Sequence, residues 1–173
     1  MKIAWVGLGL GVALALQTTL ASAGAGVGAP VDLVLVVVVA VAVASGPIAG
    51  LWAGTAGGLL QDALSGGVIG VGGLAKTLVG YLVGLAGSRF VIARPWHQVL
   101  VFFFASLVHA GCFIGVYSLL YDEGTMMSYG AVLTQATANA AVGATLAVGL
   151  RVGPGWLGRR QLRRRTLSRR FGG

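Results

Sequence analysis

Two charged side chains lie in the stretch Leu51–Gly84, which is rich in glycine and otherwise apolar. They are the carboxylate of Asp62 and the ammonium of Lys76, in a chain that has only 4 acidic residues. Charges at membrane depth are costly, so they usually pair with each other or serve a function. Because a glycine-rich turn separates the two residues, helix ends that carry them can meet. One hypothesis is therefore a direct ion pair between Asp62 and Lys76.

Each charge also has a simpler explanation that the sequence leaves open. Asp62 could cap the glycine loop or reach interfacial water, instead of shaping the outer face or contacting a partner. Lys76 could extend its ammonium to headgroup level along its own apolar stem. Three nearby glycines complete the set of candidate structural or partner-contact residues: Gly58, Gly66 and Gly70.

No spacing in the chain predicts catalysis or metal binding. A zinc site needs three or four matched ligands, and Cys112 with the two histidines, His97 and His109, does not supply them. These residues also do not form a nucleophile, base and orienting group. We therefore predict no enzyme, no metal and no cofactor, and we expect His109 to pack within a helix. Amides inside apolar runs are expected to form hydrogen bonds between helices: Gln17, Gln135 and Asn139.

The composition indicates an integral membrane protein. Of the 173 residues, 57% are hydrophobic and 9% are charged, whereas soluble domains have about 45–50% apolar and about 25% charged residues. There are too few charges to cover a water-soluble surface. The single cysteine has no partner within the chain for a disulfide.

The apolar runs predict an all-α protein, a compact bundle of about six transmembrane helices in a single domain over residues 1–155. A span needs about 20 apolar residues, and the second and third runs, divided by a break at Pro47, are short. The segment 65–73 between the third and fourth is expected to be a glycine-rich loop or a re-entrant piece. The alternative for the first run is a signal peptide, which would leave five spans. The predicted spans are 3–20, 32–44, 48–64, 74–90, 99–121 and 129–150.

Lysine and arginine near the helix ends place both termini in the cytoplasm, because basic residues favour the inner side of a membrane. The remaining residues, 156–173, form a basic cytoplasmic tail. We expect this tail to contact anionic lipids or an acidic partner. We do not expect it to bind nucleic acid, since no nucleic-acid-binding fold accompanies it. Its arginines are Arg159, Arg160, Arg163, Arg164, Arg165, Arg169 and Arg170.

Glycines recur at four-residue spacing in several of the predicted spans. Small residues at this spacing let membrane helices approach closely, which predicts a tightly packed bundle. With 30 glycines in the chain, several such spacings arise by chance, so they do not identify a partner interface. The spacings are Gly50/Gly54/Gly58, Gly80/Gly84 and Gly111/Gly115.

One extended pattern runs from Pro30 to Gly84. Its parts are Pro30-Val31-Asp32, the break at Pro47, Gly54-x-x-Gly57-Gly58-Leu59-Leu60-Gln61-Asp62, Leu64-Ser65-Gly66 with Gly70, and Leu74-Ala75-Lys76-Thr77-Leu78-Val79-Gly80-Tyr81-Leu82. In order, spacing and residue type this pattern resembles the MreD family of rod shape-determining proteins. The pattern covers about a third of the chain.

The resemblance implies a non-enzymatic scaffold in the inner membrane of a bacterium, within the cell-wall elongation machinery. Its implied partners are an MreC-type bitopic protein, an MreB-type actin-like filament, and a RodA-type glycosyltransferase with its transpeptidase; homo-oligomers are possible. The implied fold is similar to the substrate-binding subunits of energy-coupling-factor transporters. The alternative function is a small-solute, vitamin-type transport subunit with an outward pocket. Residues that could line such a pocket are Trp52, Asp62, Lys76 and Tyr81.

Overall fold

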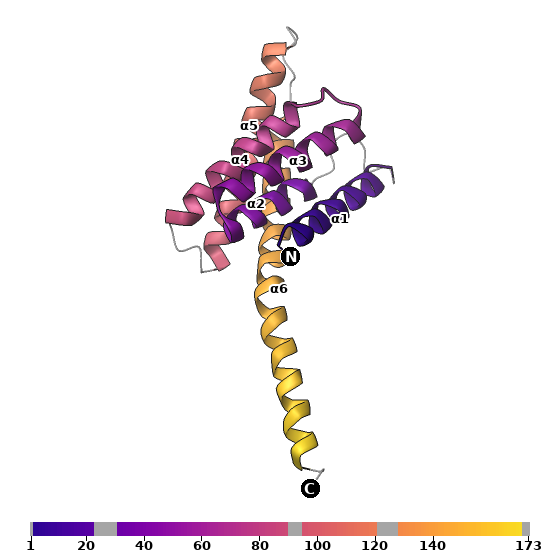
Figure 1. Ribbon diagram of the computed structural model, residues 1–173. Coiled ribbons are helices and arrows are strands. Elements are labelled where there is room, and N and C mark those ends of the chain that lie inside the picture. The colour runs from indigo at the N-terminus through magenta and orange to yellow at the C-terminus, as the bar shows by residue number, and fades with distance from the viewer. Residues whose placement is uncertain (1, 23–30, 90–94, 121–127, 171–173) are drawn as a thin grey trace.

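The computed structural model describes the backbone of residues 2–22, 31–89, 95–120 and 128–170, and the side chains of residues 4–22, 31–88, 96–120 and 128–149. The regular secondary structure in these ranges is entirely helical (Figure 1), which confirms the predicted all-α class. The helices are α1 (Lys2–Ser22), α2 (Leu33–Ser45), α3 (Pro47–Ser65), α4 (Val71–Arg89), α5 (Pro95–Leu120) and α6 (Tyr129–Arg170).

Four of these helices are long and apolar enough to cross a membrane, namely α1, α4, α5 and α6. The protein is therefore a multi-pass membrane protein, but the prediction of six full spans holds for only four of the helices. α2 is apolar but has 13 residues, so it is about 20 Å long against a hydrocarbon core of about 30 Å. α3 has 19 residues, but with its polar side chains and glycines it is not among the helices apolar enough to cross a membrane.

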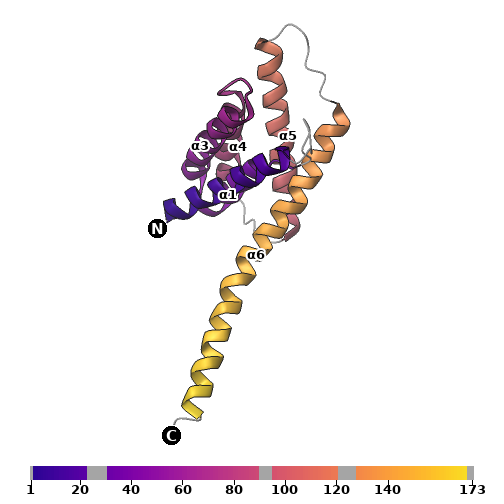
Figure 2. The same cartoon turned by 90° about the vertical axis from the view of Figure 1, so that its right-hand side faces the viewer.

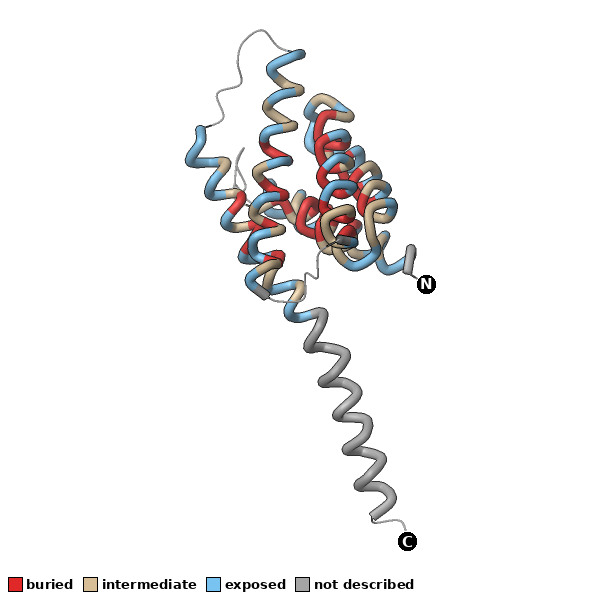
Figure 3. The backbone as a smooth tube through the Cα atoms, turned by 90° about the vertical axis from the view of Figure 1, so that its left-hand side faces the viewer, coloured by how far each residue is buried: buried red, intermediate tan, exposed pale blue. Residues whose placement is uncertain are grey.

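α2 is the central helix, because it contacts every other helix of the bundle. Its sequence, LVLVVVVAVAVAS, is apolar on all sides, as expected of a helix buried all round. Valine is a modest helix former, so packing rather than intrinsic propensity stabilises this helix. Figure 3 shows the buried residues gathered where the central helices meet. The buried α2 residues are Val34, Leu35, Val36, Val38, Val39 and Ala42.

The other helices surround α2 in two groups. α3 and α4 pack along each other and against α2, and α1 covers α2 and α3 from outside (Figure 1). α5 and α6 pack together on the other side (Figure 2), and α6 then continues away from the bundle. The predicted last span, 129–150, is thus the first half of a longer helix.

The contact between α3 and α4 depends on glycine. A Cβ atom added at Gly50 would overlap the backbone of Gly80, and one at Gly54 would lie 2.6 Å from the carbonyl carbon of Lys76. Real Cβ atoms do not come so close to backbone atoms. Only glycine at these positions allows the two helices to approach at this distance.

Two helix starts differ from the prediction. α4 begins at Val71 rather than at 74, so the expected loop 65–73 shortens to a turn in which Gly66 and Gly70 have φ of 68° and 105°. Left-handed φ values of this kind favour glycine. α5 begins at Pro95 rather than at 99. Proline is compatible with this position, since it is well tolerated in the first turn of a helix.

We predict that Gly54→Ala destabilises the protein through the α3–α4 contact. The added methyl group should lower the free energy of unfolding by about 1–3 kcal/mol. The matched control is Gly111→Ala on α5, where an added Cβ meets nothing within 4 Å. The control should be neutral or stabilising by up to about 1 kcal/mol, since alanine is the better helix former. Equilibrium unfolding of both purified variants measures the difference, and equal stabilities would contradict the packing argument.

Candidate functional site

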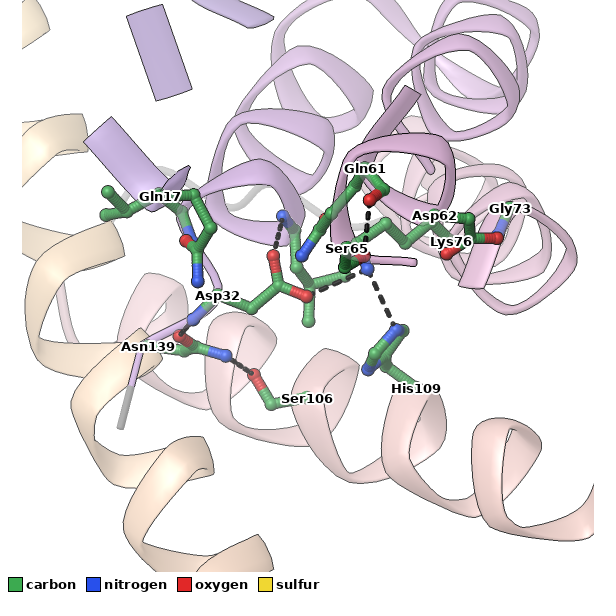
Figure 4. A network of polar contacts seen from close by, with 12 residues as sticks. Gln17, Asp32, Gln61, Asp62, Ser65, Gly73, Lys76, Ser106, His109 and Asn139 are labelled. Carbon is green, nitrogen blue, oxygen red and sulfur yellow. Dashed lines mark hydrogen bonds and ion pairs between the residues drawn. The ribbon is translucent and has the colours of Figure 1, made fainter. Parts of the chain in front are cut away.

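A cavity of about 280 Å³ opens at one end of the bundle. The start of α2, the end of α3, the start of α4, the second half of α5 and the start of α6 meet there. Alternating helix directions bring these ends together, and they correspond to the outer side in the predicted orientation. Figure 4 shows several of the polar side chains of the cavity wall, among them Asp32, Lys76 and His109, together with neighbouring residues.

The ammonium of Lys76 forms the centre of the site. Its Nζ lies 2.8 Å from Oδ2 of Asp32 and 3.2 Å from Nε2 of His109. The side chains of Lys76 and Asp32 are only 3% and 6% exposed. Lys76 therefore does not extend to the headgroups, and its charge is balanced within the protein (Figure 4).

Asp32 also caps the N-terminus of α2. Its Oδ1 accepts a hydrogen bond of 2.9 Å from the N–H of Leu35, which satisfies one of the free donors of the first turn. The backbone N–H of Asp32 donates to Asn139 of α6 at 2.8 Å, and the Asn139 amide donates to Ser106 of α5 at 3.0 Å. One connected network thus joins α2, α4, α5 and α6.

The two sequence-predicted charges, Asp62 and Lys76, both line the cavity, but the structure does not pair them. Oδ2 of Asp62 instead accepts hydrogen bonds from the backbone N–H groups of Gly70 and Gly73, at 2.9 and 3.0 Å. These groups belong to the start of α4, where a negative charge is favourable because of the helix dipole. Asp62 therefore has the geometry of a cap, and this cap explains why α4 begins earlier than its glycines predict.

The remaining candidates from the sequence have varied positions. A Cβ added at Gly58 would be 2.5 Å from the Cα of Gly73, so Gly58 belongs to the α3–α4 contact. Gly66 is the left-handed C-cap of α3, and Gly70 forms the turn before α4.

Trp52 is 66% exposed and, like Tyr81, is not part of the cavity wall. The tail arginines lie outside the side chains that the structure describes.

Two of the three amides that were predicted to form hydrogen bonds between helices do so. Asn139 forms the contacts given above. Gln17 of α1 donates to the carbonyl of Val31 at 3.0 Å and accepts from the N–H of Leu33 at 2.9 Å. Gln135 is part of the cavity wall.

Sequence reasoning missed Asp32 as the partner of Lys76 and assigned His109 only to packing. A signal for Asp32 was present, because it is one of few acids and directly precedes the most apolar helix. In the part of the chain whose side chains are described, no group of three or more histidine, cysteine or acidic residues could bind a metal ion. The arrangement can join helices and offer a polar cavity.

We predict strong coupling between Asp32 and Lys76. Asp32→Asn keeps a good N-cap residue but leaves the buried ammonium without its counter-ion, which should lower stability by about 3–5 kcal/mol. Adding Lys76→Met removes that buried charge, so the double variant should lose less than Asp32→Asn alone. Unfolding of the wild type, both single variants and the double variant completes the cycle. Additive effects would mean that the pair is not the main cause of the loss.

Comparison with known proteins agrees with the sequence pattern. A sequence model of the family described as rod shape-determining protein MreD matches residues 2–138. No curated protein and no solved structure matches the chain. Because the family match covers most of the sequence, including α1 to α5 and the first turns of α6, the protein belongs to the MreD family of rod shape-determining membrane proteins.

Proposed function

We propose that this protein is a non-enzymatic scaffold of the bacterial cell-wall elongation machinery. The observation that carries the proposal is the match of residues 2–138 to the rod shape-determining family. The cavity network supports it, because its charges join helices to one another instead of forming a catalytic set. Its action would be to bind and position other components at the membrane.

The partners that we propose follow from the family: an MreC-type bitopic protein, an MreB-type filament, and a RodA-type glycosyltransferase with its transpeptidase. A bitopic partner has one transmembrane helix, which needs a face to pack against. The exposed face of α5 at Gly111 and Gly115 supports such a contact, since a Cβ at either position would meet nothing within 4 Å. Small residues permit close approach of a second helix there.

We further propose a location in the bacterial inner membrane with both termini in the cytoplasm. The arginine-rich end of the chain supports this orientation. We also propose that the helices are arranged like those of the substrate-binding subunits of energy-coupling-factor transporters. Its support is a compact helical bundle with a cavity at one end.

The second candidate function is a small-solute binding subunit. One observation favours it: several polar and charged side chains, including Asp62 and Lys76, line the cavity. Ligand sites are concave and carry a few placed polar groups. The cavity volume of about 280 Å³ lies just below the range of about 300–1,000 Å³ for such sites.

In a rod-shaped host of origin, depletion of the protein should produce round cells, and the wild-type gene should restore rods. The readout is the length-to-width ratio of cells by microscopy, with membrane levels measured in parallel. Unchanged cell shape after full depletion would contradict the scaffold and make solute binding the leading function.

The same complementation assay separates the roles of Asp62. As a cap of α4, Asp62 should affect the amount of folded protein rather than partner binding. We therefore expect Asp62→Ala to restore rods when its membrane level matches the wild type. Asp62→Asn, which keeps one acceptor oxygen, is the milder comparison. Failure of both at matched levels would assign this carboxylate to a partner contact.

Reporter fusions should verify the orientation. Alkaline phosphatase is active only outside the cytoplasm, so a fusion after Gly173 should be inactive and a fusion after Gly124 active. Green fluorescent protein at Gly173 should fluoresce. The opposite pattern would place the cavity mouth on the cytoplasmic side.

A further inference from the structure

An apolar groove of about 580 Å³ lies between α4 and α5. It shares no lining residue with the polar cavity. Of the described residues that line the groove, His97 alone has a polar side chain, and the others are aliphatic or aromatic. The groove therefore offers apolar contacts along nearly its whole length.

The groove has a buried floor and exposed edges. Val79 and Val83 of α4 and Ala105 of α5 are buried and belong to the floor. Leu82 of α4 and Phe104 of α5 are 43% and 58% exposed and belong to the edges. Both helices are long and apolar enough to cross a membrane, so the groove lies at membrane depth and opens towards lipid.

The length of the groove matches the depth of one leaflet. Along α5 it extends from His97 to Val108, which at about 1.5 Å per residue is a length of about 16 Å. Half of the hydrocarbon core of a bilayer measures about 15 Å. Val108 lies in the middle of α5, and His97 lies in its first turn. The groove therefore runs from the middle of the membrane to one of its edges.

The groove ends at a basic edge of the membrane. Arg89 is the last residue of α4, about one turn beyond the groove residue Ala86. The partial charges of the two helix ends, negative at the end of α4 and positive at the start of α5, offset each other. Two of the four acidic residues line the polar cavity, and the other two follow the opposite end of α5 in the sequence. The charge of Arg89 therefore makes this edge complementary to an anionic group.

The dimensions of the groove favour an acyl chain over a helix. A helix is about 10 Å across, so over this length it occupies about 1,300 Å³, more than twice the volume of the groove. Membrane helices also associate through small residues, whereas Leu82 and Phe104 make the edges of the groove bulky. An acyl chain is thin and purely apolar, so it agrees with both the shape and the chemistry.

We propose that the groove binds one acyl chain of an anionic phospholipid, whose headgroup lies at the Arg89 edge. Basic sites between transmembrane helices recognise anionic lipid headgroups. This site is separate from the arginine-rich tail, because α4 and α5 form it. In the orientation proposed above, the lipid belongs to the cytoplasmic leaflet. The inference goes beyond the scaffold role and does not depend on it, since lipid binding is measured on the purified protein.

The test is a lipid titration of the purified full-length protein, followed by native mass spectrometry. Two probes with the same acyl chains differ in headgroup charge: phosphatidylglycerol is anionic and phosphatidylcholine is zwitterionic. For the first lipid bound, we expect a dissociation constant at least about fivefold lower for phosphatidylglycerol, as one arginine near an anionic lipid provides. Equal dissociation constants would overturn the proposal of an anionic lipid.

A pair of arginine variants locates the headgroup. Arg89→Gln should reduce the preference for phosphatidylglycerol to about twofold or less and leave phosphatidylcholine binding unchanged. The matched control is Arg151→Gln, which removes the same charge from α6, a helix that does not line the groove. If both variants keep the full preference, it arises elsewhere, as in the arginine-rich tail, and the proposal is wrong.

Variants of the groove locate the acyl chain. Leu82→Gln places a polar side chain at the edge of the groove and should weaken binding of both lipids about fivefold or more. The matched control is Leu78→Gln on the same helix, where the leucine is similarly exposed but does not line the groove. Ala86→Phe fills the groove and should have the same effect as Leu82→Gln. Because Leu82 is exposed, its replacement tests the site even where Ala86→Phe fails to fold.

The same spectra detect other occupants of the groove. A dimer that Ala86→Phe dissociates, with lipid binding unchanged, would make the groove an interface between two copies and overturn the lipid proposal. Equal lipid binding by the groove variants and the Leu78→Gln control would place the lipid elsewhere, with the same consequence. Round cells after depletion, together with no lipid preference, would retain the scaffold and reject the lipid site, so the two proposals fail separately.

Discussion

The buried ion pair between Lys76 and Asp32 is the interaction on which the bundle depends. An ammonium without a counter-ion at this depth costs several kcal/mol, so α4 can pack only where the start of α2 supplies a carboxylate. The pair therefore determines how α2 and α4 are placed along each other. Asn139 and Ser106 connect α6 and α5 to this ion pair. The side-chain oxygen of Asn139 accepts a hydrogen bond from the backbone N–H of Asp32, and its amide donates one to Ser106.

A second constraint places Lys76 where this pair can form. The glycines of α3 allow its backbone to contact that of α4, which brings Asp62 to the N–H groups at the start of α4. The cap fixes the first turn of α4, and Lys76 follows in the next turn. The close packing of the two helix backbones and the placement of charge are therefore linked. A side chain larger than glycine at the α3–α4 contact would displace both the cap and the ion pair.

The sequence predicts the helices well because long apolar runs and a proline break are local signals. It predicts the start of α4 less well, since glycine lowers helix propensity and the capping carboxylate comes from the preceding helix. The site was only partly predictable. Asp62 is the acid nearest to Lys76 in sequence, so it was the natural partner to infer. The actual partner, Asp32, is brought to Lys76 by the packing of α2, which no spacing rule contains.

The cavity follows from the way the bundle accommodates these charges. Two carboxylates at helix starts must lie near the same end of the bundle, because α2 and α4 begin there. Apolar side chains cannot fill the space beside such groups without leaving polar atoms unsatisfied. His109 belongs both to the polar network and to the cavity wall. Its Nε2 contacts Lys76, and its Nδ1 has no hydrogen-bond partner among the described residues. Because Asp32, Lys76 and His109 all line the cavity, whatever occupies it contacts the same network that joins the helices.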